Sequence, residues 1–106
     1  MRILHVLAAM GLLTGLFAAS GAALADAEAA KATATGVCAG CHGPKGVSGA
    51  DSFPNLAGQK KGYLTSALKA YRDKSRNAPI MNGMAGPLSD QEIDDLAAYF
   101  SGLKAE

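Results

Sequence analysis

The chain of 106 residues is almost neutral, with ten basic and nine acidic side chains and a formal net charge of +1. This length allows one ordinary domain, and the charge balance provides no general attraction to nucleic acid or acidic lipid. There is no Trp, and Gly accounts for 13 residues, so large apolar side chains are scarce. We therefore expect a small domain that needs a staple or a cofactor to complete its core.

Residues 1–25 are typical of an export signal. Arg2 precedes an apolar run that ends in Ala23-Leu24-Ala25, a small-x-small pattern accepted by signal peptidases. The strongly apolar part, residues 3–19, lies at the lower end of the roughly 17–25 residues that span a bilayer, so a retained anchor is the alternative. We expect cleavage before Asp26, a mature domain of residues 26–106, and a periplasmic protein without membrane attachment.

Three segments carry helical signals. Residues 27–38 and 60–73 have apolar side chains at helical spacing, and a third segment follows Ser89, which forms a capping box with Glu92. Gly102 is the expected stop of that last helix. The expected buried faces of the first two segments consist of Ala27, Ala30, Ala34 and Val37, and of Leu64, Ala67, Leu68 and Tyr71.

No segment alternates as a strand would, so the chain predicts an all-α fold. The stretches between the helices, residues 40–58 and 75–88, are rich in Gly and Pro and predict two irregular loops. Long loops inside a compact domain usually have a function or wrap around something.

The sequence "CAGCH", residues 38–42, contains both cysteines of the chain. A structural zinc site would need a second pair of Cys or His, which residues 26–106 do not offer. A redox dithiol would start a helix in a fold that contains strands, and a disulfide would close too short a loop to stabilise much. These readings are therefore disfavoured.

Covalent haem attachment matches the same five residues. The thiols of Cys38 and Cys41 would add to the two vinyl groups of a porphyrin, and His42 would place an imidazole beneath the iron. This attachment takes place outside the cytoplasm, so the export signal is an independent requirement that the chain meets. We expect one covalently bound haem c, whose apolar faces would supply the missing core.

The second axial position of the iron has two candidate ligands. Residues 26–106 contain no other His, and their only methionines are Met81 and Met84, both in the second predicted loop. A thioether ligand raises the reduction potential, because soft sulfur prefers ferrous iron. Spacing alone leaves the choice between the two methionines open.

Residues 29–103 resemble the class I c-type cytochromes of the small bacterial monohaem kind, and one half of the bacterial dihaem cytochromes c. The resemblance is carried by "CAGCHG", "FPNLAGQ", "YL", "LKAYRD" and "NAPIMNGMAGPLSDQEIDDLAAYF". It implies a small cytochrome c fold, with about three main helices and long loops wrapped around one haem.

The resemblance also implies roles for individual residues. The ligand methionine of the family lies eight residues before the serine that starts the last helix, which points to Met81. The carbonyl of Pro54 is expected to accept a hydrogen bond from Nδ1 of His42. Arg76 and Asn77 are candidates for hydrogen bonds to a haem propionate.

The function implied is that of a periplasmic one-electron carrier, a monomer and not an enzyme, that serves larger membrane or periplasmic oxidoreductases. One alternative is the haem c subunit of a periplasmic dehydrogenase complex. A more remote one is a haem protein that binds a ligand at an open iron.

Overall fold

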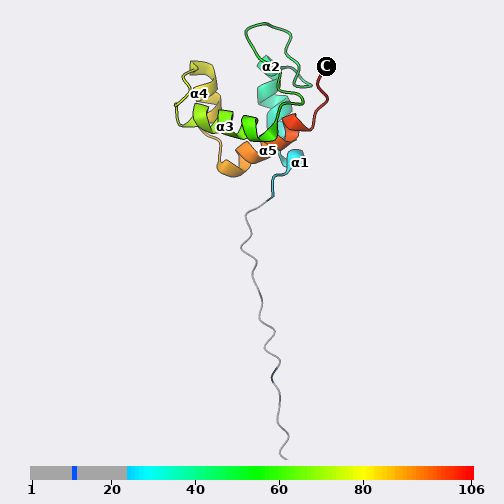
Figure 1. Cartoon of the computed structure of the whole chain (residues 1–106), viewed down its shortest axis with the longest axis vertical. Coiled ribbons are helices and arrows are strands. Elements are labelled where there is room, and N and C mark those ends of the chain that lie inside the picture. The colour runs from blue at the N-terminus through cyan, green and yellow to red at the C-terminus, as the bar shows by residue number, and fades with distance from the viewer. Residues whose placement is uncertain (1–10, 12–23) are drawn as a thin grey trace, which may run out of the picture.

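The computed structural model describes Gly11 and residues 24–106, so most of the predicted export signal lies outside the described residues (Figure 1). The elements are α1 (Ala27–Thr33), the π-helical segment η1 (Ala34–Cys38), α2 (Ala39–His42), α3 (Lys61–Arg72), α4 (Pro79–Ala85) and α5 (Asp90–Ser101). Helices are the only regular elements of residues 24–106, as the sequence predicts.

The first helical stretch begins at Asp26 and runs through α1, η1 and α2 without interruption. The Asp26 side chain caps it by accepting hydrogen bonds from the backbone N–H groups of Glu28 and Ala29, at 3.0 and 3.2 Å. Ala30 and Ala34 are buried in the cluster that α5 completes. Their small side chains allow the two helices to approach closely, as predicted.

The π-helical turn changes which residues face the core. In η1 the N–H of Ala39 donates to the carbonyl of Ala34, which widens this turn relative to an α-helix. As a result Cys38 packs against the core cluster, whereas Val37 is 56% exposed. The predicted buried face was therefore wrong at Val37, and also at Ala27, which is exposed beside the cap.

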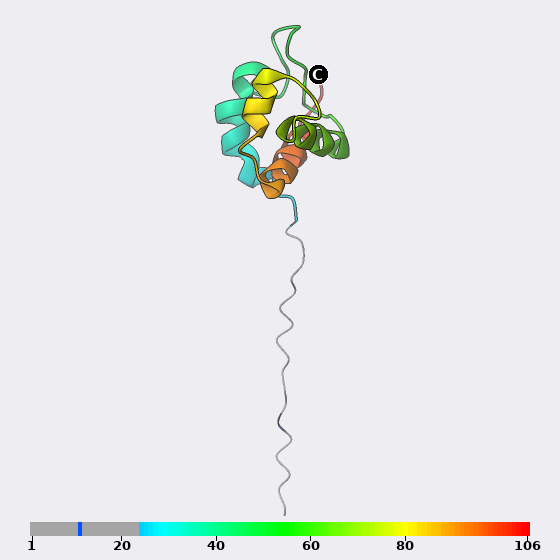
Figure 2. The same ribbon diagram turned by 90° about the vertical axis from the view of Figure 1, so that its left-hand side faces the viewer.

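Helix α5 is the common partner of α1 and α3 (Figure 2). Leu96, Ala97 and Phe100 of α5 join Leu64 of α3 in the core, and Ile93 is fully buried. Helix α3 has the predicted face toward the core. Its bounds lie within one residue of the prediction.

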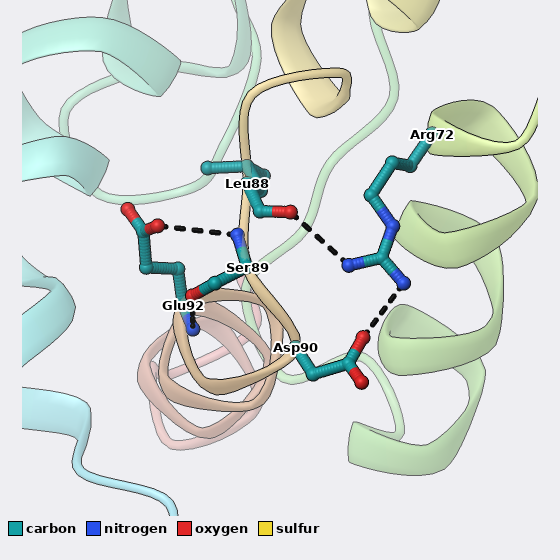
Figure 3. A network of polar contacts seen from close by, with 5 residues as sticks. All are labelled: Arg72, Leu88, Ser89, Asp90 and Glu92. Atoms are coloured by element: carbon teal, nitrogen blue, oxygen red, sulfur yellow. Dashed lines mark hydrogen bonds and ion pairs between the residues drawn. The ribbon is translucent and has the colours of Figure 1, made fainter.

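The predicted capping box at the start of α5 is present. Oγ of Ser89 accepts from the N–H of Glu92, and Oε1 of Glu92 accepts from the N–H of Ser89, each at 3.1 Å (Figure 3). The helix ends before Gly102, which keeps a right-handed helical conformation with φ −82°. Local sequence alone thus determines the start of this helix.

The second predicted loop contains a helix that the sequence analysis missed. Pro79 occupies the first turn of α4, where its missing N–H costs no hydrogen bond, and the helix ends before Gly86. Proline is well suited to begin a helix, so the Pro content of this stretch does not exclude one. The prediction of an irregular stretch over residues 75–88 was therefore wrong for residues 79–85.

The first predicted loop is irregular from Gly43 to Lys60, although α2 extends to His42. The carbonyl of Gly46 accepts from the N–H groups of Leu56 and Ala57, at 2.8 and 3.0 Å. The N–H of Gly58 donates to the carbonyl of Phe100 at 2.9 Å. These bonds close the loop on itself and attach it to the end of α5.

Within the part of the chain that the structure describes, every helix is too short or too polar to cross a membrane.

Candidate haem site

His42 is the last residue of α2 and is buried, with 7% of its surface exposed. Its Nδ1 lies 2.8 Å from the carbonyl oxygen of Pro54. A carbonyl only accepts hydrogen bonds, so this contact assigns the ring proton to Nδ1 and leaves the lone pair on Nε2. The imidazole is thus oriented as a metal ligand, because Nδ1 is bound to the backbone and Nε2 is left for the metal.

Two further features hold this imidazole in place. The ring of Phe53 meets it edge to face, with centroids 6.4 Å apart and planes inclined at 66°. Gly43 directly after it has φ +85°, and a Cβ at this position would overlap the carbonyl oxygen of Val47. Only glycine allows the chain to reverse this tightly behind the histidine.

Cys38 and Cys41 are free thiols, and both are half-buried. Burial raises the pKa of the Cys38 thiol, and a backbone hydrogen bond opposes this only in part. The direction of this shift agrees with the contact of Cys38 with the apolar core. No group of three or more His, Cys, Asp or Glu side chains gathers to hold a metal ion in the described part of the chain.

Both candidate methionines belong to α4. Met81 is half-buried, and Met84 is 49% exposed. Figures 1 and 2 both place α4 and α2 on one side of the pair formed by α3 and α5. The helix with the histidine and the helix with the methionines thus lie over the same side of the domain.

Asn82 attaches α4 to the end of α3, a role that the sequence analysis did not assign. Its Oδ1 accepts from the N–H of Ala78 at 3.0 Å, at the start of α4. Its Nδ2 donates to the carbonyls of Tyr71 and Arg76, each at 2.8 Å. Three hydrogen bonds from one half-buried side chain therefore position the helix that carries Met81.

Arg72 makes a similar connection between α3 and the start of α5. Its Nη1 donates to the carbonyl of Leu88 at 3.1 Å, and its Nη2 lies 2.6 Å from Oδ1 of Asp90 (Figure 3). The hydrogen bond from Arg72 lowers the pKa of Asp90, and the charges of Arg72 and Lys69 add to the effect. Arg72 thereby fixes the segment between α4 and α5 at Leu88 and at Asp90.

The cytochrome c family model matches residues 18–104. The chain belongs to the cytochrome c family. This confirms the resemblance to small class I c-type cytochromes, whose fold is all-α, and with it electron transfer by a haem group. The family implies covalently bound haem c, and two free thiols next to a buried, oriented imidazole fit such a group.

The match with this cytochrome covers a different share of each of two relatives. Cytochrome c-554(548) of Halomonas halodenitrificans is 51% identical over 69 residues, which are 62% of this chain and 83% of that protein. Cytochrome c4 of Pseudomonas aeruginosa is 45% identical over 92 residues, which are 87% of this chain but 43% of that protein. The chain thus spans about half the length of the cytochrome c4 proteins it matches, which agrees with the predicted resemblance to one half of a longer cytochrome.

Solved structures give the same picture of this cytochrome. Cytochrome c4 of Acidithiobacillus ferrooxidans matches with a TM-score of 0.71 and 36% identity, over 79% of this chain and 53% of that one. A thiosulfate dehydrogenase from Marichromatium purpuratum matches with a TM-score of 0.72 and 38% identity, over 76% of this chain and 20% of that one.

Arg76 and Asn77 of this cytochrome are exposed. The guanidinium of Arg76 lies over the ring of Tyr71, 4.6 Å from its centroid, and Nη1 is 3.5 Å from the hydroxyl of Tyr63. These contacts explain the position of Arg76 without a haem propionate. The propionate role of both residues stays a prediction.

The sequence contains little that indicates the positioning roles of Asn82 and Arg72. Asn82 comes three residues after Pro79, and Arg72 is the last residue of α3, but each finds its partners across a turn or on another helix. A sequence pattern with helical spacing does not contain such contacts.

Proposed function

We propose that this chain is a periplasmic one-electron carrier that holds one haem c through thioethers to Cys38 and Cys41. His42 and Met81 would bind its iron, through an imidazole nitrogen and a thioether sulfur. The observation that carries it is the contact between Nδ1 of His42 and the carbonyl of Pro54, which leaves Nε2 available for the iron, one residue after the second thiol.

The residues divide the work of binding. Cys38, packed against the core, and Cys41, one turn further along the helix, would anchor the porphyrin at the end of the first helical stretch. His42 would bind the iron from that side, and α4 would bring Met81 from the other. When bound, haem c supplies an iron that accepts and releases one electron.

Closure of both axial positions favours electron transfer over catalysis. An iron gripped by an imidazole and a thioether offers no site for a substrate, and sulfur stabilises the ferrous state. We therefore expect a carrier and not an enzyme. Asn82 and Arg72 would serve this function indirectly, because they hold the methionine helix in place.

The proposed location follows from the predicted export signal. Residues 1–25 would direct the chain to the periplasm and would be removed before Asp26, which leaves the domain 26–106 without a membrane segment. We expect a monomer. Because that domain has equal numbers of acidic and basic side chains, it would meet its redox partners through local surfaces and not through a general charge. Those partners would be larger membrane or periplasmic oxidoreductases.

A haem c subunit of a dehydrogenase is the second candidate. The likeness to part of the Marichromatium thiosulfate dehydrogenase favours it. So does the "thiosulfate dehydrogenase electron acceptor" of Thiomonas intermedia, which is 40% identical over 105 residues, 98% of this chain and 45% of that protein. A partner that co-purifies in fixed proportion would support this candidate, and a free monomer would support the carrier.

The decisive experiment is a peroxidase-type haem stain on a denaturing gel, with the protein matured in an exporting host that has the attachment machinery. Only a covalently held porphyrin stays with the unfolded chain, so we expect a stained band that C38A together with C41A abolishes. A colourless mature chain with free thiols would end the proposal. Rapid binding of carbon monoxide by the reduced wild-type protein would instead favour the open, ligand-binding alternative.

A further inference from the structure

Asp95 is a buried acid on α5 that the proposed haem site does not use. Only 8% of the surface of this residue is exposed. Among residues 24–106 the only ion pair is the one between Arg72 and Asp90, so no lysine, arginine or histidine side chain neutralises Asp95 there. A buried carboxylate is costly unless a cation or several hydrogen-bond donors compensate it.

Two N–H groups converge on one oxygen of this carboxylate. The backbone nitrogen of Asp26 lies 2.7 Å from Oδ1 of Asp95, and Nε2 of Gln91 also lies 2.7 Å from it. Asp26 is 69 positions away in the chain, so this contact joins the beginning of α1 to the middle of α5. The nitrogen involved is the one that follows the predicted cleavage site.

We propose that maturation turns this nitrogen into the missing cation, and that the new N-terminal ammonium of Asp26 pairs with Asp95. Signal peptidase would hydrolyse the peptide bond between Ala25 and Asp26. Water adds across the broken C–N bond, so that Ala25 leaves as a carboxylate and Asp26 keeps a protonated amine. No oxidant or reductant takes part. This inference rests on the export that forms part of the proposed function.

The site accepts the change without rearrangement. The nitrogen already lies at hydrogen-bond distance from Asp95, and the Asp26 side chain caps α1 through its own carboxylate. That carboxylate and Asp95 together offset the unfavourable effect of an ammonium at the positive end of a helix. Gln91 also donates to the carbonyl of Leu24 at 3.2 Å, and removal of the leader frees this amide for Asp95 alone.

The ion pair would act on the helix that binds the porphyrin. Helix α1 continues through η1 to Cys38, Cys41 and His42. A charged bond from its first residue to α5 therefore holds the whole stretch against the core. In this way removal of the leader would stabilise the proposed haem site from a distance.

The test compares two exported holoproteins, both directed by a foreign signal sequence. One is cleaved directly before Asp26, and the other keeps Gly-Ser-Ala ahead of Asp26, so that its nitrogen remains an uncharged amide. Each is prepared with and without D95N, and with D94N as the matched control from the same helix. Denaturant unfolding is followed by the absorption of the haem.

We expect D95N to raise the unfolding equilibrium constant about tenfold to a hundredfold more in the chain that starts at Asp26 than in the extended chain. D94N should have the same effect in both backgrounds. If D95N fails to fold, the two chains with Asp95 intact still decide, because the extended one should unfold more readily and exchange the α1 amides faster.

Equal stability and equal amide exchange of these two chains would overturn the proposal, as would equal effects of D95N in both backgrounds. A natural N-terminus other than Asp26 by intact mass would also overturn it. Absence of haem from all of the proteins would instead contradict the proposed function, so the two failures are distinguishable.

Discussion

Nδ1 of His42 donates a hydrogen bond across 2.8 Å to the carbonyl oxygen of Pro54, twelve positions further along the chain. Because the histidine is buried, this ring proton should exchange slowly with solvent. We expect an imidazole N–H signal in the NMR spectrum of the ferrous protein that persists well after transfer to deuterated water. F53A, which removes the ring packed edge to face on His42, should speed its exchange. A signal lost at once in the wild-type protein would mean that this contact opens freely.

Met81 and Met84 can be told apart by single substitutions. M81A should open one axial position, so that the reduced protein binds carbon monoxide and the ferric protein loses the weak red absorption band of thioether coordination. M84A should leave both properties unchanged, because Met84 is the more exposed of the two. The reverse result would transfer the ligand role to Met84.

Asn82 should contribute more to stability than an ordinary surface amide. N82A removes three hydrogen bonds of a half-buried side chain, and we expect a loss of about 2–3 kcal/mol in the free energy of unfolding. The proposed methionine ligand should also dissociate more readily, which faster binding of carbon monoxide would reveal. S66A, at an exposed position of neighbouring α3, serves as the control and should change stability by less than about 0.5 kcal/mol. An unchanged binding rate in N82A would show that Asn82 does not position the ligand.

The pair of Arg72 and Asp90 should make the free energy of unfolding depend on pH in the acid range. Its hydrogen bond lowers the pKa of Asp90 in the folded protein, so the stabilisation is present above the unfolded value of about 3.9 and is lost as the pH falls through the lowered folded value. Asp73 behaves in the same way, because a hydrogen bond from Ser75 lowers its pKa. D90N should therefore flatten the acid side of the curve of stability against pH. The difference should shrink in high salt, since Asp90 is 72% exposed. A curve identical to that of the wild type would contradict this assignment.

Gly43 should not tolerate a side chain. G43A places a Cβ on the carbonyl oxygen of Val47 and forces alanine into φ +85°, so we expect a loss of more than about 2 kcal/mol and a lower yield of holoprotein. Gly49 lies in the same loop with open space around its Cα, and G49A should cost less than about 0.5 kcal/mol. Equal yields and stabilities of the two variants would contradict this reading of the turn.

The parts of the molecule that were predictable from the sequence depend on residues close together in the chain. The capping box needs only Ser89 and Glu92, and it located the start of α5. The five residues 38–42 predict covalent haem attachment from side-chain type and spacing alone. The face of α3 followed from helical spacing, because that helix is regular throughout.

The missed features depend on partners that a local pattern does not contain. Helix α4 is a seven-residue segment with a glycine inside it, and the side chain of Asn82 secures it to carbonyls outside the helix. Val37 lies outside the predicted buried face because the π-helical turn is wider than the regular α-helical turn on which the prediction rests.

By itself the sequence determined the helical class and the family, and it named the candidate residues for haem binding, because those depend on side-chain type and on spacing within a few positions. Only the tertiary structure decided that His42 meets Pro54, that Asn82 secures α4, and that Asp26 reaches Asp95. The reason is physical: these bonds join segments whose separation is settled only when the core of α1, α3 and α5 packs together.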